Sequence, residues 1–154
     1  MKEFSKAYAT FIVLFLTLTA ISCNGKKDNP QPEDTSKVTS LNLTLDTTQK
    51  GHQDAMATLQ DAAGINDKTG DVITLDANGS YAGTIVLQDA TQMPVATVTS
   101  DYTITYQITG ADAAITAAGP SPTITTRAAG SGTLGITLVK GDKTTMVTFP
   151  LTIR

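Results

Sequence analysis

The sequence predicts an all-β fold, and three observations support this prediction. From residue 37 onward, short runs rich in Thr, Val, Ile and Leu recur between Gly, Asp, Asn and Pro residues, which is typical of antiparallel strands. No run follows the period of an amphipathic helix. The chain has no Trp and only 5% aromatic residues, so aliphatic side chains must supply the core. Turn signals roughly every 10–14 positions predict an antiparallel β-sandwich of immunoglobulin-like type with seven to nine strands, and a closed barrel is the alternative.

The first half of this region predicts four strands. Leu41–Leu45 alternates strictly, so its three leucines share one face and its polar residues the other. The step Asn78-Gly79 suits the positive φ of a hairpin turn between two strands. The other three expected strands are Met56–Gln60, Val72–Leu75 and Tyr81–Gln88.

The second half predicts four more strands. Met93-Pro94 interrupts the strand pattern, and Gly119–Pro122 marks a crossover or a sheet edge, because proline has no N–H to donate. Pro150 likewise indicates an edge or a bulge, and Gly141-Asp142 a tight hairpin. The expected strands are Tyr102–Ile108, whose Tyr102, Ile104, Tyr106 and Ile108 share a core face, then Ile124–Arg127, Leu134–Leu138 and Met146–Ile153.

The amino-terminal segment predicts export. Two lysines precede the apolar run Phe11–Leu18, which is too short and too interrupted by Thr to remain as a bilayer span. Ala20-Ile21-Ser22-Cys23 resembles the bacterial lipobox, with Ala20 in place of the usual Leu. The resemblance implies that residues 1–22 are cleaved and that Cys23, the only cysteine, is lipidated. An ordinary secreted protein is the alternative.

The residues after Cys23 predict a tether and an address. Asn24–Ser36 has no apolar residue, two prolines and five charges, which is typical of a disordered segment. Residues 23–36 would therefore connect the lipid to a folded domain at 37–154. By resemblance to bacterial lipoproteins, Asn24 favours the outer membrane and Lys26–Asp28 a surface signal. The cell surface and the periplasmic face both stay open.

The net charge argues against nucleic-acid binding. The whole chain has a formal charge of −3, and removing Lys2, Glu3 and Lys6 leaves 9 basic and 13 acidic residues, or −4. Phosphate neutralisation needs clustered Lys and Arg, and the sequence shows no such cluster. We therefore expect no nucleic-acid partner.

The acidic stretch from Asp67 to Asn78 suggests two kinds of site. Asp67–Gly70 matches the letters of the phosphorylated aspartate motif of P-type ATPases, but the rest of that machinery is absent from the sequence. A calcium loop is the second, although the spacing is not that of an EF-hand. Turn residues explain the same letters, and calcium binding stays open. The side chains concerned are Asp67, Asp71, Asp76 and Asn78.

Enzymatic constellations are not expected. The only histidine, His52, is expected in a solvent-exposed loop beside Gly51, with no Gly-x-Ser-x-Gly elbow to accompany it. A glycosidase pair needs two facing carboxylates, and residues 37–154 contain no Glu. We therefore predict no catalysis, no cofactor and no metal. Aromatic residues are expected mainly in the core rather than in a sugar-binding platform.

Several stretches resemble small lipoproteins of Bacteroidota. They are the lipobox, the charged tether, Gly70–Asp89, Gly132–Leu138 and Val147–Ile153. Some such lipoproteins are encoded beside TonB-dependent receptors, so the resemblance implies a non-enzymatic binding or accessory domain at the outer membrane that assists an uptake receptor. A structural or adhesive cell-surface module is the alternative. Asp46-Thr47-Thr48 also resembles the Bacteroidota O-glycosylation acceptor, which makes Thr47 a candidate.

Overall fold

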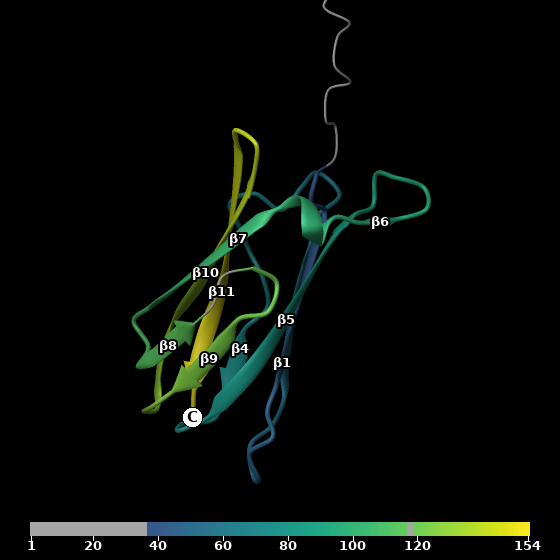
Figure 1. Ribbon diagram of the computed structural model, residues 1–154. Coiled ribbons are helices and arrows are strands. Elements are labelled where there is room, and N and C mark those ends of the chain that lie inside the picture. The colour runs from purple at the N-terminus through teal and green to yellow at the C-terminus, as the bar shows by residue number, and fades with distance from the viewer. Residues whose placement is uncertain (1–36, 117–118) are drawn as a thin grey trace, which may run out of the picture. The chain divides into compact units, whose positions relative to one another are not determined.

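The computed structural model describes residues 37–116 and 119–154 (Figure 1). The expected signal peptide, the lipidation candidate Cys23 and the expected tether lie outside the described residues. Within the described part, nearly every element is a strand, and one short 3₁₀ turn, η1 (Thr99–Asp101), interrupts them. No helix among these residues is long and apolar enough to cross a membrane.

The first sheet holds six antiparallel strands in the order β2-β1-β5-β9-β8, with β6 beside β5. Its strands follow the predicted alternation, so that Leu41, Leu43 and Leu45 are fully buried while the intervening residues face outward. The members are β1 (Ser40–Asp46), β2 (Ala55–Gln60), β5 (Ser80–Asp89), β6 (Ala96–Thr97), β8 (Ala113–Thr116) and β9 (Thr123–Thr126).

The second sheet has the order β3-β11-β10-β7, with β4 also beside β11. The β10–β11 pair is the expected hairpin, which turns through Gly141 at a φ of 57°. β3 and β4 run parallel to β11, so this sheet is mixed rather than purely antiparallel. The members are β3 (Lys68–Thr69), β4 (Ile73–Leu75), β7 (Thr103–Thr109), β10 (Gly130–Lys140) and β11 (Lys143–Ile153).

The strand order is that of an immunoglobulin-like sandwich. The neighbours β1-β5-β9-β8 correspond to the A-B-E-D sheet of that fold, and β7-β10-β11 to its C-F-G sheet. β2, β3, β4 and β6 are additions at the sheet margins. The predicted β-sandwich is therefore confirmed, but the described residues form eleven strands where seven to nine were expected, and β3, β6 and β8 are the strands that were not predicted.

The core lies between the inner faces of the two sheets. Leu134, Ile136 and Leu138 of β10 are buried in the same cluster as the leucines of β1, and Tyr81 and Phe149 are the largest fully buried side chains. The hydroxyl of Tyr81 accepts a hydrogen bond from the N–H of Asp76 at 2.8 Å, which satisfies its polar end.

The step Asn78-Gly79 carried two predictions, one about its backbone conformation and one about the strands that it joins, and they have different outcomes. Asn78 adopts the expected positive φ of 57°, but the predicted hairpin is wrong. β4 belongs to the second sheet and β5 to the first, so the turn carries the chain from one sheet to the other. An Asn-Gly step specifies local φ, and packing decides which sheet each flanking strand joins.

The prolines lie where a missing N–H does no harm. The carbonyl of Thr148 on β11 accepts a hydrogen bond from the N–H of Gly70, so the backbone groups of Thr148 point towards β3. Pro150 lies two residues further along β11, and its backbone groups therefore point to the same side. The nitrogen of Pro150 therefore faces the interval between β3 and β4, so that Pro150 is tolerated in an internal strand and does not lie at the edge or bulge expected there. Pro120 and Pro122 contribute only their carbonyls, which accept bonds from β5.

Candidate functional site

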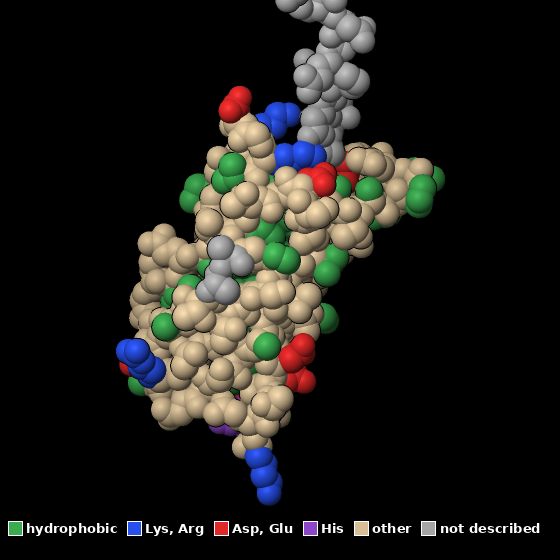
Figure 2. Space-filling model, in the orientation of Figure 1, with side chains coloured by type: hydrophobic (Ala, Val, Ile, Leu, Met, Phe, Trp, Pro, Cys, Tyr) green, Lys and Arg blue, Asp and Glu red, His purple; other side chains and the backbone are tan. Residues whose placement is uncertain are grey.

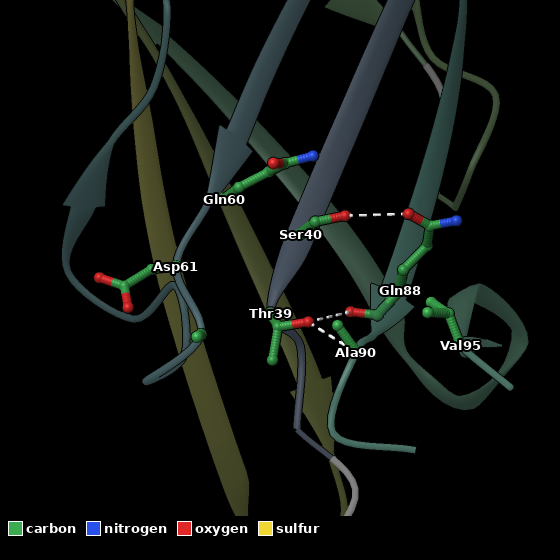
Figure 3. Close-up of a pocket in the computed structure, with 8 residues that line it drawn as sticks. Thr39, Ser40, Gln60, Asp61, Gln88, Ala90 and Val95 are labelled. Atoms are coloured by element: carbon green, nitrogen blue, oxygen red, sulfur yellow. Dashed lines mark hydrogen bonds between the residues drawn. The ribbon is translucent and has the colours of Figure 1, made fainter. Parts of the chain in front are cut away.

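Three polar side chains form a row across the outer face of the first sheet. Strand register places Ser40 of β1 directly opposite Gln60 of β2 on one side and Gln88 of β5 on the other. The Ser40 hydroxyl donates to Oε1 of Gln88 at 3.1 Å (Figure 3). Because this bond uses the carbonyl end of the Gln88 amide, its NH₂ end is left to face outward.

This row is the floor of a hollow of about 330 Å³, which we call the polar hollow. Its size falls at the lower end of the range of ligand pockets. Five of its eight lining residues carry hydroxyl, amide or carboxylate groups, but more of the exposed wall is apolar than polar, with Ala62, Ala90 and Val95 among the lining residues (Figure 3). The lining residues are Thr39, Ser40, Gln60, Asp61, Ala62, Gln88, Ala90 and Val95.

Thr39 ties the floor of the polar hollow to its rim. Its hydroxyl donates to the carbonyl of Gln88 at 3.2 Å and accepts from the N–H of Ala90 at 2.8 Å. Both bonds are structural, and Thr39 is only 3% exposed. The groups that remain to contact a ligand are the amides of Gln60 and Gln88, whereas the Asp61 carboxylate points away from Ser40 and Gln88 (Figure 3).

Asp61 supplies an ionised acceptor at the edge of the polar hollow. The backbone N–H of Ala63 donates to its Oδ1 at 2.8 Å, and Lys68 Nζ lies 3.1 Å from its Oδ2. The Ala63 hydrogen bond, followed by that from Lys68, holds the pKa of Asp61 below its usual value. Asp61 is therefore suited to accept hydrogen bonds at neutral pH rather than to donate a proton.

Asp89 builds the loop at the rim, residues 90–95, which we call the rim loop. Its side chain is fully buried and accepts bonds from the N–H and hydroxyl of Thr91, the side-chain amide of Gln92 and the backbone N–H of Lys37. Burial alone would raise the pKa of Asp89, but these hydrogen bonds outweigh it and lower the pKa. The rim loop is thus fixed to the residue at which the described chain begins.

The calcium candidates do not meet at one site. Asp67 donates its backbone N–H to Met146 near the start of β11, whereas Asp76 pairs with Arg154 beyond the end of that strand, at 3.0 Å. Asp71 bonds Thr58, and Asn78 lies in the turn. Within residues 37–116 and 119–154, no three His, Cys, Asp or Glu side chains cluster as metal ligands.

The stretch Asp67–Gly70 pairs with β11 at the edge of the second sheet. Lys68 and Thr69 form β3, and the hydroxyls of Thr69 and Thr148 lie 3.1 Å apart. The N–H of Gly70 donates to the carbonyl of Thr148. The letters that match the aspartate motif therefore serve strand pairing in this fold, and only Asp67, with a φ of 55°, lies in a turn as expected.

His52 and Thr47 lie in the β1–β2 connection, at the opposite end of the strands from the polar hollow. His52 lies in a loop as expected, but it is half-buried and not fully exposed. Its ring lies 6.5 Å from that of Tyr81, and its Nδ1 is buried without a hydrogen-bond partner among the described residues. Thr47 is half-buried and its hydroxyl accepts the N–H of Gln49, whereas the neighbouring Thr48 is exposed.

Charged side chains are sparse on the flanks of the sandwich. On the face shown in Figure 2, Lys, Arg, Asp and Glu gather towards the two ends of the described domain. The outward positions of the second sheet carry no charge at all, and ten of the sixteen are threonine. They are Thr69, Thr74, Thr103, Thr105, Gln107, Thr109, Ser131, Thr133, Gly135, Thr137, Val139, Thr144, Met146, Thr148, Pro150 and Thr152.

Sequence reasoning missed the polar hollow because its floor is made by strand register. Gln60, Ser40 and Gln88 are separated by dozens of residues and look like ordinary outward positions. The usable signal was their parity, since each occupies the polar side of an alternating strand. Comparison of the chain with protein-family models, with curated proteins and with solved structures found no match.

Proposed function

We propose that this chain is a lipid-anchored outer-membrane lipoprotein whose β-sandwich binds, without catalysis, a neutral and hydroxyl-rich ligand in the polar hollow. The observation that carries the proposal is the cross-strand row of Gln60, Ser40 and Gln88. It presents amide donors and acceptors from neighbouring strands of a sheet, and rigid elements hold binding groups more precisely than loops do.

The chemistry of the polar hollow selects the ligand class. Amide groups both donate and accept, so they match sugar hydroxyls, which do the same. Asp61 is the charged residue of the lining and is already paired with Lys68, so the lining holds no cation that could pair with an anionic ligand, while Ala90 and Val95 offer an apolar edge for C–H groups. One or two sugar-sized units fit a volume of about 330 Å³.

The expected lipid anchor indicates where this binding would take place. The lipobox-like Ala20–Cys23 precedes 13 residues before Lys37, a length that reaches on the order of 45 Å when extended. Lys37 itself bonds Asp89 at the rim of the polar hollow. Acylation of Cys23 would hold the hollow near the bilayer, where a ligand could be passed to an uptake receptor.

Titration of the mature chain, observed by ¹H–¹⁵N NMR, tests the proposal. Maltohexaose is the neutral probe, and an oligogalacturonate of similar length is the anionic comparison. We expect maltohexaose to shift the side-chain amide signals of Gln60 and Gln88, and the anionic sugar to leave them unchanged. Signals that stay fixed with maltohexaose, or shift only outside the polar hollow, would contradict the proposal.

A matched pair of variants sharpens this test. Gln60 and Gln107 are both exposed glutamines on outer sheet faces, but only Gln60 lines the polar hollow. Loss of one neutral hydrogen bond costs about 0.5–1.5 kcal/mol, so Gln60→Ala should weaken maltohexaose binding by roughly two- to tenfold. Gln107→Ala should leave the affinity unchanged.

An adhesive cell-surface module is the second candidate, and the uncharged outer face of the second sheet favours it. Exposed surfaces usually carry about a quarter to a third charged residues, whereas the cores of protein interfaces are depleted of charge. Thr137→Lys together with Thr148→Lys would place charge at the middle of that face. Reduced cell-to-cell adhesion in this variant, with maltohexaose binding intact, would favour the adhesive function over ligand capture.

A further inference from the structure

We infer that the rim loop contacts the lipid bilayer in which the acyl chains of Cys23 are embedded. Its tip exposes unusually large apolar side chains: Met93 is 95% exposed and Val95 54%. Pro94 and Ala90 are exposed beside them. The loop between β5 and β6, which holds these residues, projects from the sandwich beyond the end of β5 (Figure 1).

The rim loop is a built feature with a fixed base. Four hydrogen bonds converge on the buried carboxylate of Asp89, and three of them come from Thr91 and Gln92 within the loop itself. The Thr39 hydroxyl accepts the N–H of Ala90 and closes the same base. Exposure of the apolar tip therefore does not require the loop to unfold or to rearrange.

The attachment point of the chain lies at this base. The fourth bond to Asp89 comes from the backbone N–H of Lys37, at 3.2 Å, and 13 residues separate Lys37 from Cys23. Even fully extended, those residues reach only on the order of 45 Å. A lipid on Cys23 thus keeps the end of the sandwich that bears the rim loop close to the bilayer, so the nearest apolar medium for Met93 and Val95 is lipid.

The composition of the rim loop fits an interfacial contact with neutral headgroups. Residues 90–98 contain no charged side chain, so the contact draws on apolar burial and not on attraction to anionic lipid. Burial of apolar groups in lipid is favourable for each group that enters it. A few such groups give weak binding alone, but they can orient a domain that acyl chains already retain. The polar hollow would then open beside the headgroups.

This inference rests on the acylation of Cys23 in the proposed function, and the experiment separates the two. The full mature, acylated chain carrying Met93→Cys is labelled with the polarity-sensitive fluorophore NBD and reconstituted into phosphatidylcholine vesicles. The acylated Cys23 sulfur is a thioether and does not react, so Cys23 adds no second label. Lys50→Cys, in the exposed β1–β2 connection at the opposite end, is the control.

We expect a blue shift and quenching by spin-labelled lipid for the probe at position 93, with neither at position 50. Val95→Asp should abolish the shift at position 93. Val72→Asp should preserve it, since Val72 is similarly exposed at 58% but lies outside the rim loop. A solvent-like probe at position 93, on protein that is acylated by mass and floats with the vesicles, would overturn this inference and leave the anchor standing. Absence of acylation would overturn the anchor and the inference together.

Discussion

The carboxylate of Asp71 accepts hydrogen bonds from both the N–H and the hydroxyl of Thr58, at 3.0 and 2.8 Å. Thr58 lies in the middle of β2, which is an edge strand of the first sheet. The N–H of Asp71 also donates to the carbonyl of Thr58. One aspartate therefore occupies both the N–H and the carbonyl of Thr58, at the middle of the edge strand, which is a form of edge protection.

Removal of this carboxylate should expose the β2 edge. We expect Asp71→Ala to increase concentration-dependent self-association, measured by light scattering after size-exclusion chromatography. Asp54→Ala, which removes an exposed aspartate in the connection before β2, is the control. It should self-associate no more than the parent does. Equal self-association in the two variants would argue against a protective role for Asp71.

The same contact predicts a pH dependence. The Thr58 hydroxyl, and then the Thr58 N–H, lower the pKa of Asp71. Because the folded pKa lies below the unfolded one, the stabilisation is complete above the unfolded value, near 3.9, and is lost as the pH falls through the folded value. The melting temperature of Asp71→Asn should therefore lie below that of the parent at pH 7, and this difference should be smaller at pH 3. An equal loss at both values would contradict this assignment.

Asp89 should be the most sensitive polar position at the end of the sandwich that carries the polar hollow. Hydrogen bonds to a charged acceptor contribute about 1.5–3 kcal/mol each, so Asp89→Ala should destabilise the domain by at least about 2 kcal/mol. Chemical denaturation measures this change. The variant should also release the rim loop, which hydrogen exchange at Thr91 and Gln92 would report. Unchanged exchange there would show that Asp89 does not hold the loop.

The alternating strands made the fold predictable, and long-range pairing limited the prediction. Leu41–Leu45 and Leu134–Leu138 carry a period of two over enough residues to identify both strand and buried face. β3 and β6 have two residues each, too few to show a period, and β8 is rich in small residues. Tertiary contacts with β11, β5 and β9 create these three strands.

The polar hollow shows the same limit at the level of a site. Each of Gln60, Ser40 and Gln88 was assignable to an outward strand position, but nothing in the sequence states that β1 lies between β2 and β5. The long-range contact of Asp89 was equally hidden in the sequence, because an aspartate at a strand end usually indicates a turn. Here it is fully buried and joins the rim loop to Lys37, which is 52 positions away.

Tyr81 offers a test of how the core is joined to the β4–β5 turn. Its ring is fully buried, and its hydroxyl accepts the Asp76 N–H at 2.8 Å. Tyr81→Phe keeps the ring but leaves that N–H without its partner, so we expect a loss of about 0.5–1.5 kcal/mol in unfolding free energy. Leu43→Ala, a purely apolar truncation in the same core, should cost about 2–5 kcal/mol. A Tyr81→Phe variant as stable as the parent would show that the hydroxyl is replaceable by solvent.

Cys23→Ala tests whether a lipid on Cys23 anchors the domain to the membrane. Two or more acyl chains give stable membrane anchoring, whereas a few apolar side chains at the rim loop give only weak attachment. The variant should lose incorporation of radiolabelled palmitate and move from the membrane to the soluble fraction. Ser22→Ala keeps a small residue before the cysteine and should retain both the label and the membrane. Labelling that persists in Cys23→Ala would refute the lipid anchor. Loss of label with full membrane retention would instead mean that the domain reaches the membrane by another contact, and the rim loop would then be the first surface to alter.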